Sequence, residues 1–507
     1  MRKTFKIFIF LLIVFTVFAI SGCMASRDNE EEDNSNIENI EGTENGGTEN
    51  GGTENGGTEN QPIDNIADYD PNVQVEIEFW HAMGQTSVNL IGEIISNFNE
   101  LYPNITVNER SLGDYDTLRE TIISGISSDN LPTVAQTYPD HVALYLKRNV
   151  MRSLDDYIDS TKTITLAGGS VDIIGLSQDN QDLYIDGFFA EGKCYDLEGT
   201  LYSLPFNKST EVMYYNKTIF DKYGWSAPQT WDDVVTIAEA YTYTVEYQNA
   251  INKGKIVAAF AADSEDNLFI TLTKQWGGEY TKLDESGKGV YAFDNAESKA
   301  ALAFFKENYD KGYFATATHF GADYSSEAFV AGNIIMTIGS SAGVSYNVPK
   351  DGSFEVGVCA YPQKDMNNPQ VIQQGTNVSL FKCANPQEEL AGWLFIKFLT
   401  NYESALLWCT ETAYFPIRKD VLNSLKYIEH ISGKMYDDRG NVIYKPNTQQ
   451  LAQKIGLEQQ TWFYTTVAFE GSSLARDEAK LIVQAILYGG KTIDRAYSEA
   501  IEALLYS

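Results

Sequence analysis

The stretch Val73-Gln-Val-Glu-Ile-Glu-Phe-Trp80 and the pattern directly after it decide the fold class. Apolar and polar residues alternate through this stretch, as they do in a strand with one buried face. The period then changes over residues 88–101, a run that stops before Pro103. Its apolar residues recur at helical spacing: Leu90, Ile91, Ile94, Ile95 and Phe98. The pattern predicts a strand followed by a helix that covers it.

The next segments repeat this order. Residues 105–109 predict a second strand, 115–124 a second helix and 131–136 a third strand. Such a βαβαβ start is typical of a mostly parallel sheet covered by helices. Later elements follow the same alternation: helices over 231–243, 298–308, 388–399, 476–487 and 492–504, and strands over 211–215, 334–338 and 354–358. The sequence therefore predicts an α/β protein.

The N-terminus carries an export signal. A basic start precedes an apolar run over residues 7–20, which closes on Ile20-Ser-Gly-Cys23. The run is shorter than the roughly 20 apolar residues of a membrane-spanning helix, so it predicts a signal peptide over residues 1–22. Cys23 after Ile-Ser-Gly resembles the lipobox of bacterial lipoproteins, where the thiol is acylated, for example by palmitate. We expect Cys23 to hold the protein on the extracytoplasmic face of the cell membrane. The alternative is an ordinary signal peptide with an incidental cysteine.

Residues 23–70 are a predicted linker between this anchor and a domain over 71–507. The linker repeats Gly-Gly-Thr-Glu-Asn and has almost nothing apolar to bury, so burial cannot offset the entropy of ordering it. We expect a disordered acidic spacer. The formal net charge of −33 argues against nucleic acid or an anionic membrane surface as partners, because both need clustered lysine and arginine.

The cysteines and histidines predict neither a metal site nor a cofactor. Four cysteines follow the anchor, and they allow three disulfide pairings among which the sequence does not choose: Cys194, Cys359, Cys383 and Cys409. There is no closely spaced cysteine pair and no His-x-x-x-His, so a zinc site is unsupported.

Six motifs in consistent order carry a family resemblance. They are Glu78-Phe-Trp-His-Ala-Met-Gly84, Gly113-Asp-Tyr-Asp116, Leu201-Tyr-Ser-Leu-Pro-Phe-Asn-Lys-Ser-Thr-Glu-Val-Met-Tyr-Tyr-Asn216, Thr230-Trp-Asp-Asp233, Ile335-Met-Thr-Ile-Gly-Ser-Ser341 and Thr412-Ala-Tyr-Phe-Pro-Ile-Arg418. Together they resemble the extracellular solute-binding proteins, family 1, of ABC importers. That group includes the maltose-binding and sn-glycerol-3-phosphate-binding proteins.

The resemblance implies a periplasmic-binding-protein-like type II fold, with two α/β lobes joined by a hinge of crossing segments. It assigns residues as follows: lobe 1 to about 71–207 and 362–408, lobe 2 to about 208–361 and 414–507, and the crossings to 207–212, 358–363 and the region of Thr410. The ligand would lie in the cleft, and the closed state would be recognised by the permease. The implied protein is a monomer and not an enzyme. Its partners are a small molecule, the transmembrane subunits of a permease, and the membrane through the lipid.

The glycerol-3-phosphate-binding type matches best and implies a set of ligand-binding residues: Tyr115, Ser209, Ser340 or Ser341, Gly375 and Tyr414. We expect further aromatic faces from Tyr138 and Trp276, and Asp140 in place of a family glutamate. Trp276 is equally compatible with a core position. His81 and Asn207 are additional candidates, with a brace in the first lobe and a cap on the crossing segment as their structural alternatives.

The phosphate-binding arginine of that type has no match, because Ala468-Phe-Glu470 stands in its place and Arg476 lies further along. A phosphate needs a guanidinium or several backbone N–H groups. The sequence therefore favours a neutral sugar or oligosaccharide, with sn-glycerol 3-phosphate or a glycerophosphodiester as the alternative.

Gly339-Ser-Ser-Ala-Gly343 also satisfies the Gly-x-Ser-x-Gly pattern of a serine hydrolase. A hydrolase would need a histidine downstream, and His430 is the candidate, in a polar stretch that suits a buried base poorly. Serine hydrolase activity is the distant alternative, and a surface adhesin without a closing cleft is a third class.

Overall fold

The computed structural model describes residues 66–128 and 130–506, and these lie within one compact unit. The signal peptide, Cys23 and most of the linker lie outside the described residues. Within the described part, none of the helices combines the length and the apolar character that crossing a membrane requires.

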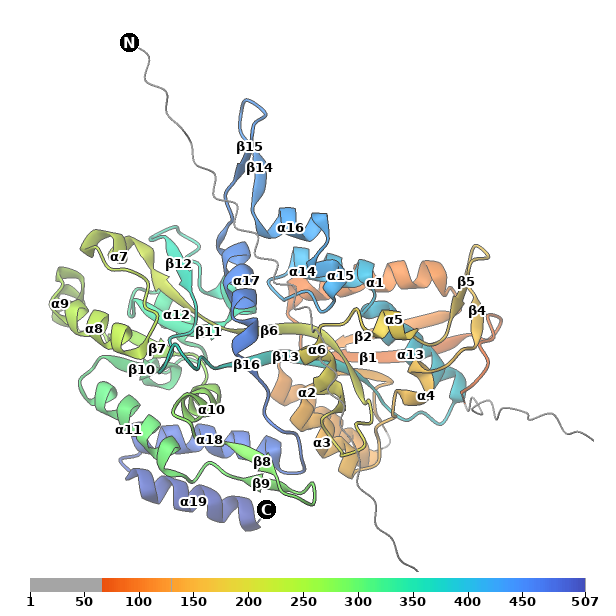
Figure 1. The fold of residues 1–507 in the computed structure, drawn as a ribbon, viewed down its shortest axis with the longest axis horizontal. Helices are drawn as coiled ribbons and strands as arrows, with labels where there is room; N and C mark the ends of the chain where they lie inside the picture. The colour runs from red at the N-terminus through yellow and green to blue at the C-terminus, as the bar shows by residue number, and fades with distance from the viewer. Residues whose placement is uncertain (1–65, 129, 507) are drawn as a thin grey trace, which may run out of the picture. The chain divides into compact units, whose positions relative to one another are not determined.

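A ten-stranded sheet runs through this unit in the order β10-β7-β11-β6-β13-β3-β1-β2, with β12 beside β6 and β16 beside β13 (Figure 1). Its strands are β1 (Val75–His81), β2 (Ile105–Ser111), β3 (Val134–Thr137), β6 (Ser203–Asn216), β7 (Phe260–Ala262), β10 (Phe314–Thr316), β11 (Met336–Ser340), β12 (Val356–Cys359), β13 (Val371–Leu380) and β16 (Phe463–Tyr464). The predicted parallel start is confirmed, because β1 pairs in parallel with both β2 and β3. The centre of the sheet is antiparallel, at β6 and β13.

Two large apolar cores lie on either side of this centre. The first core packs β1, α1 and α13 around residues such as Phe79, Phe98 and Trp393. The helices on its side, shown on the right of Figure 1, are α1 (Gln85–Leu101), α2 (Tyr115–Ser128), α3 (Pro139–Lys147), α4 (Asp155–Ile158), α5 (Gln178–Gln181), α6 (Asp186–Ala190), the 3-10 turn η1 (Glu191–Lys193), α13 (Pro386–Leu399), α14 (Tyr402–Glu411), α15 (Lys419–Leu422) and α16 (Leu425–Ile431).

The second core is built around Trp231, which contacts the rings of Phe260, Phe314 and Tyr361. The remaining helical segments are α7 (Lys217–Tyr223), α8 (Trp231–Thr242), α9 (Val245–Asn252), α10 (Glu265–Gln275), α11 (Ala296–Asp310), η2 (Ala317–Phe320), α12 (Ser325–Val330), η3 (Ser341–Tyr346), α17 (Thr448–Glu458), η4 (Gln460–Trp462), α18 (Ser472–Leu487) and α19 (Ile493–Tyr506). Thr230 caps α8 through a capping box with Asp233, as the Thr-Trp-Asp-Asp motif predicts.

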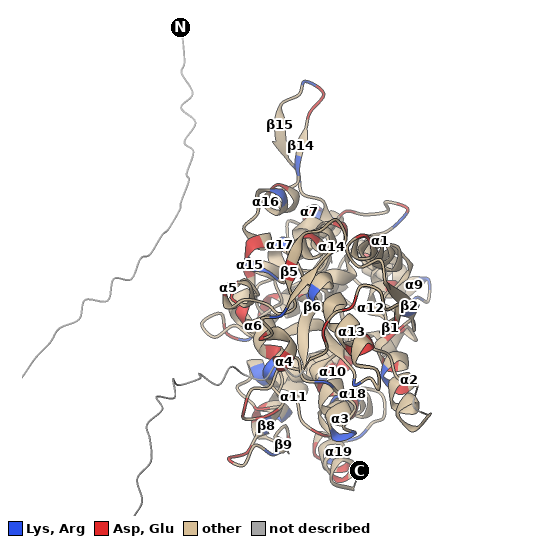
Figure 2. Ribbon diagram, turned by 90° about the vertical axis from the view of Figure 1, so that its right-hand side faces the viewer, with Lys and Arg blue, Asp and Glu red and all other residues tan. Residues whose placement is uncertain are grey.

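Three small hairpins complete the described elements: β4 (Thr163–Thr165) with β5 (Val171–Ile173), β8 (Thr281–Leu283) with β9 (Gly289–Tyr291), and β14 (Lys434–Tyr436) with β15 (Val442–Tyr444). The β14–β15 hairpin extends away from the helices around it (Figure 1). Acidic and basic positions are interspersed over the helices and loops seen in Figure 2, so the negative charge is not gathered on one element.

The strand β6 pairs with strands on both sides of the sheet centre. Its residues from Ser203 to Thr210 pair with β13, and those from Glu211 onward pair with β11. The crossing expected near 207–212 therefore lies in the middle of one continuous strand.

The other two crossings differ from the expectation. β13 pairs with the first half of β6. Val358 and Cys359, in β12, pair with Tyr214 and Met213 beyond the crossing, and Gln363 accepts a hydrogen bond from Gln275 on the side of the second core. The chain does not cross between the lobes near Thr410. Ile417 and Tyr427 beyond it still pack in the first core, and α17 begins only after the β14–β15 hairpin.

Candidate functional site

A cavity of about 230 Å³ lies between α2 and α3 on one side and α10 and α18 on the other, with β13 at its base. Its lining is polar and strongly charged: Tyr115, Asp116, Arg119, Tyr138, Pro139, Asp140, His141, Glu191, Asp266, Asn267, Ile372, Gln373, Gln374, Gly375, Thr465, Thr466, Val467, Ala468, Arg476, Asp477 and Lys480. Side chains from both sides of the sheet centre therefore meet around one space.

Two tyrosine rings form the aromatic part of this cavity. Tyr115 opens α2 and Tyr138 precedes α3, and their ring centroids lie 4.9 Å apart in an edge-to-face arrangement. The amide of Asn207 donates to the Tyr115 hydroxyl at 3.1 Å, and Tyr414 hydrogen-bonds both residues. Burial raises the pKa of Tyr115 well above its usual value, so this hydroxyl is neutral at physiological pH and can donate or accept.

Both arginines of the cavity are already paired. Arg476 Nη1 donates to Asp266 Oδ2 at 2.7 Å and to Asn267 Oδ1 at 2.6 Å. Burial alone would raise the pKa of Asp266, but the charge of Arg476 and its hydrogen bonds bring that pKa below the usual value. Arg119 Nη1 donates to Ser473 Oγ at 2.6 Å and lies 3.7 Å from Asp477. The carboxylates thus offset the positive charge of the site.

Glu191, on η1, lines the cavity and is fixed in place by Lys208 and Gln373. The Lys208 ammonium, fully buried on β6, forms an ion pair with Glu191 and donates to the Gly375 carbonyl at 3.3 Å. The Gln373 amide donates to Glu191 Oε1 at 3.0 Å. This Glu191–Lys208–Gln373 group fixes the base of the cavity to both central strands.

Glu211 follows on the same strand β6 and is 3% exposed, with Oε2 lacking a hydrogen-bond partner among the described residues. Burial raises the pKa of Glu211 to about 8, with further increases from the nearby charges of Asp266 and Asp263. At neutral pH this carboxyl is protonated in most molecules.

The structure brings four of the predicted residues into the lining: Tyr115, Tyr138, Asp140 and Gly375. Tyr414 and Asn207 join them indirectly, through their hydrogen bonds to Tyr115. Their direct contact with ligand remains a prediction.

The three predicted serines do not line this cavity: Ser209 lies on β6, and Ser340 and Ser341 lie beside the middle of that strand. Ser340 Oγ donates to Ser209 Oγ at 3.3 Å, and Ser341 Oγ accepts the backbone N–H of Thr210 at 3.3 Å. Among the described residues these hydroxyls hold β11 and η3 to the strand. A ligand role for them would require the site to extend beyond this cavity.

Trp276 and His81 lie elsewhere. Trp276 packs against Phe304 at the edge of the second core and lies under the Lys364 ammonium, a position that agrees with its core alternative. His81 ends β1 fully buried, with Nε2 2.7 Å from Glu109 Oε1 and Nδ1 accepting the Met83 N–H, which makes it a brace. Neither ring faces the cavity lining.

The sequence motifs do not indicate several residues of the lining, among them Arg476, Arg119, Asp266, Glu191 and Gln373. Arg476 lies further along the chain than the position at which the resemblance places the phosphate-binding arginine. The available signal was helical spacing, since Arg476 and Lys480 are one turn apart on α18 and face the cavity together. The pairing of Arg476 with Asp266 joins residues 210 positions apart, which no local pattern reveals.

The Ser-His arrangement of a hydrolase is not formed by the described residues. Ser341 Oγ accepts from the Thr210 backbone, while His430 lies on α16 with its ring stacked on Tyr427. The four cysteines are unpaired in the described part of the chain, and no group of three or more His, Cys, Asp and Glu side chains there is arranged to hold a metal ion.

Gly375 is expected to be irreplaceable at its position in β13. Its φ is +94°, and a Cβ there would lie 1.9 Å from the Asn207 carbonyl oxygen. We expect Gly375→Ala to lower the free energy of unfolding by about 3 kcal/mol, measured by urea unfolding. Gly352 is the matched control, because its φ is +66° but a Cβ would meet nothing within 4 Å. Equal losses in Gly375→Ala and Gly352→Ala would show that the close approach to Asn207 contributes nothing.

The family model of the bacterial extracellular solute-binding proteins matches residues 93–431. The chain belongs to this family. Among curated relatives, the sn-glycerol-3-phosphate-binding periplasmic protein UgpB of Shigella flexneri is 24% identical over 355 residues, which cover 68% of this chain and 74% of the relative.

Solved structures of this family confirm the fold expected from the resemblance. UgpB from Mycobacterium tuberculosis, in complex with glycerophosphocholine, has a TM-score of 0.67 at 18% identity, covering 85% of this chain and 98% of that protein. Lmo0181 from Listeria monocytogenes, in complex with cycloalternan, has a TM-score of 0.66 at 17% identity, with the same two coverages. The described domain has the type II periplasmic-binding-protein fold.

Proposed function

We propose that this family member is the substrate-binding subunit of an ABC importer and that it captures a neutral carbohydrate between its two lobes. The observation that supports this most is the composition of the cavity. It presents the rings of Tyr115 and Tyr138 beside planar polar side chains, and its two arginines are neutralised by carboxylates. Aromatic faces suit the apolar face of a sugar ring, and carboxylate, amide and guanidinium groups suit its hydroxyls.

A phosphate-bearing ligand is the second candidate. Arg119, Arg476 and Lys480 all line the cavity, so basic side chains are present although the motif of the phosphate-binding arginine is absent. The relatives named for sn-glycerol 3-phosphate support the same alternative. Against it, five carboxylates line the same space: Asp116, Asp140, Glu191, Asp266 and Asp477. The Asp266 carboxylate paired with Arg476 would repel a phosphate bound at the same guanidinium.

Thermal unfolding in the presence of candidate solutes separates the two. The chain from residue 23 onward, with Cys23→Ser, is heated with neutral mono- and oligosaccharides, sn-glycerol 3-phosphate and glycerophosphodiesters. A ligand at 100 times its Kd adds about 2.7 kcal/mol of stability. Stabilisation by a neutral saccharide alone supports the proposal, and stabilisation by the phosphates alone replaces it with the second candidate.

The aromatic pair is expected to carry much of the affinity. Tyr138→Ala should raise the Kd of the stabilising solute at least 30-fold, since removing a central aromatic contact costs about 2 kcal/mol. Isothermal titration calorimetry measures the change. Tyr243→Ala serves as the control, because Tyr243 is 80% exposed and lies outside the cavity. Unchanged affinity in Tyr138→Ala would place the ligand elsewhere.

Two further parts of the proposal concern the membrane anchor and the boundaries of the two lobes. We propose Cys23 as the acylated anchor, which incorporation of labelled palmitate, lost in Cys23→Ser, would test. We also propose the lobe boundaries given above, with residues 414–431 assigned to lobe 1 because they pack with the first core.

A further inference from the structure

A second cavity adjoins the first at the base formed by β13. It encloses about 330 Å³ and shares Glu191, Gln373 and Thr465 with the first cavity. Its other lining residues come from α6, η1, η4 and β16: Ile185, Gly187, Phe188, Ala190, Cys194, Gln460, Phe463 and Tyr464. Small-molecule sites measure about 300–1,000 Å³, so the first cavity alone is small and the two together are well within the range.

The two cavities differ in chemistry. Eight charged side chains line the first, whereas Glu191 is the one charged residue lining the second, and it is paired with Lys208. The walls of the second cavity are mostly apolar, with uncharged polar side chains at Gln373, Gln460 and Thr465, and the centroids of the stacked Phe188 and Phe463 rings lie 6.5 Å apart. A polar group fits the first cavity and an apolar surface fits the second.

Glu191 and Gln373 lie between the two cavities, and the side chain of Gln373 is the one that can move at low cost. Displacing Glu191 would leave the buried Lys208 ammonium unpaired, which is strongly unfavourable. Rotating the Gln373 side chain breaks only its hydrogen bond to Glu191, which is a much smaller loss. Gln373 is therefore the side chain that yields when a ligand reaches from one cavity into the other.

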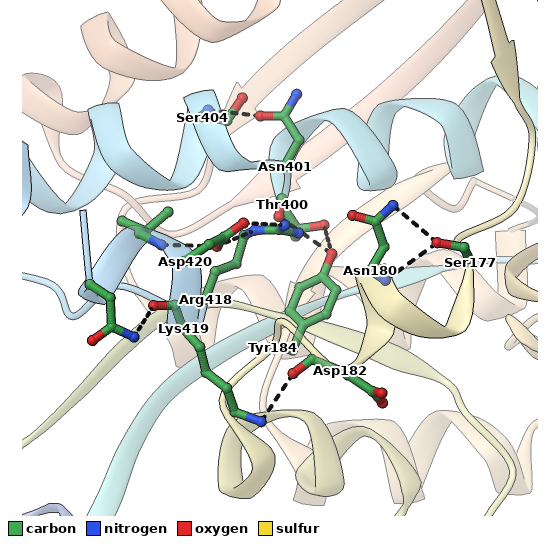
Figure 3. Close-up of polar contacts among 12 residues, drawn as sticks. Ser177, Asn180, Asp182, Tyr184, Thr400, Asn401, Ser404, Arg418, Lys419 and Asp420 are labelled. Atoms are coloured by element: carbon green, nitrogen blue, oxygen red, sulfur yellow. Dashed lines mark hydrogen bonds and ion pairs between the residues drawn. The ribbon is translucent and has the colours of Figure 1, made fainter. Parts of the chain in front are cut away.

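The outer wall of the second cavity is fixed to the first core. Figure 3 shows the residues that hold the segment before α6: the Tyr184 hydroxyl bonds Thr400 at 2.8 Å, and Lys419 Nζ donates to the Asp182 carbonyl at 3.0 Å. The Ile185 N–H donates to the Ile417 carbonyl at 3.0 Å. The Arg418 guanidinium lies over the Tyr184 ring and is paired with Asp420. The cavity is thus preformed and does not depend on a ligand to shape it.

We infer that the ligand is bipartite, with a hydroxylated head in the first cavity and a group with an apolar face in the second. This inference rests on the proposed function and names the ligand class more closely. The apolar face can come from an aglycone, as in an aryl glycoside, or from a further sugar ring that stacks on Phe188 and Phe463. The contact chemistry is the same for both sources.

Gly187→Leu tests the inference by filling the second cavity. Gly187 is the second residue of α6, its φ is not positive, and the nearest atom to an added Cβ is Gln373 Oε1 at 3.5 Å. Gly92→Leu is the matched control, since Gly92 lies on α1 with nothing within 4 Å of an added Cβ. Thermal unfolding of both variants without ligand checks that they fold, and Gly187→Ala provides a smaller filling.

The probes are glucose, methyl and phenyl glucosides, and the malto-, cello- and xylo-oligosaccharides of two to six units. Calorimetry of wild-type protein should show at least tenfold tighter binding for the phenyl glucoside over the methyl glucoside, or for a longer oligosaccharide over its disaccharide. Gly187→Leu should remove this gain and leave the Kd of the shorter partner within about twofold. Gly92→Leu should retain the gain.

Alkylation of Cys194 gives a second readout. Cys194 lines the second cavity and is half-buried, and burial raises the pKa of its thiol to about 12. A bipartite ligand should slow its reaction with iodoacetamide at least fivefold, while Cys383, half-buried outside both cavities, should react at an unchanged rate.

The possible results distinguish the two proposals. If wild-type protein binds saccharides but Gly187→Leu weakens all of them equally, or none, the inference fails and the proposed function stands. If wild-type protein binds no neutral saccharide or glycoside in the series, the proposed function fails and the inference with it.

Discussion

Lys208→Ala is expected to lower the free energy of unfolding by about 3–5 kcal/mol, because it leaves the Glu191 carboxylate buried without its partner. Lys208 is fully buried and Glu191 is 6% exposed at its side chain. The ammonium also donates to the Gly375 carbonyl, so that oxygen loses a hydrogen bond as well. Urea unfolding monitored by circular dichroism measures the change.

Two comparisons make this result specific. The double variant Lys208→Met with Glu191→Gln removes both charges and should recover most of the loss, since replacing a buried pair by neutral groups is often close to neutral. Lys217→Ala breaks the exposed pair with Asp221 and should change the free energy of unfolding far less, because solvent screens exposed ion pairs. A loss in Lys208→Ala no larger than in Lys217→Ala would show that water reaches Glu191 in the folded protein.

Glu211→Gln is expected to change how stability depends on pH. Burial raises the pKa of Glu211 to about 8 in the folded protein, from 4.5 for the ordinary carboxyl. Between these values the folded state binds more protons than the unfolded state, so the Glu211 contribution is fully favourable below pH 4.5 and is lost as pH rises to 8. Each pKa unit corresponds to about 1.4 kcal/mol, which makes the loss on the order of 5 kcal/mol over the whole interval.

The measurement is the free energy of unfolding of both proteins from pH 5 to pH 9. The wild-type value should fall relative to Glu211→Gln by on the order of 4 kcal/mol between pH 5 and pH 9. Glu355→Gln is the control on the surface, where the side chain is 77% exposed, and it should follow wild type. Parallel curves for wild type and Glu211→Gln would mean that the carboxyl is ionised at neutral pH in the folded state.

Local patterns were enough to predict much of the fold. The alternation of 73–80 and the helical spacing of 88–101 gave β1 and α1 within a few residues, and Thr230 before two aspartates gave the start of α8. The position of the hinge strand β13 could not be obtained in this way. Its neighbours β6 and β3 are more than 150 residues away along the chain, and nothing in 371–380 itself indicates them.

The residues of the candidate site also divide into those that a short motif indicates and those that depend on partners distant in the sequence. Tyr115 and Gly375 were found because short motifs mark them, and Asp140 because it stands in the place of a family glutamate. Arg476 and Glu191 depend on partners distant in sequence, Asp266 for the former and Lys208 for the latter. Ser341 shows the opposite case: the motif located the turn after β11, but the hydroxyl is used by the backbone of β6.

The continuity of β6 also constrains how this sequence can diverge. Its 14 residues pair with β13 on one side of the hinge and with β11 and β12 on the other. Side chains alternate along a strand, so a single insertion or deletion would turn every residue beyond it to the opposite face. Across descendants of this gene, the length of 203–216 should therefore stay fixed, while length changes accumulate at hairpin turns such as 437–441.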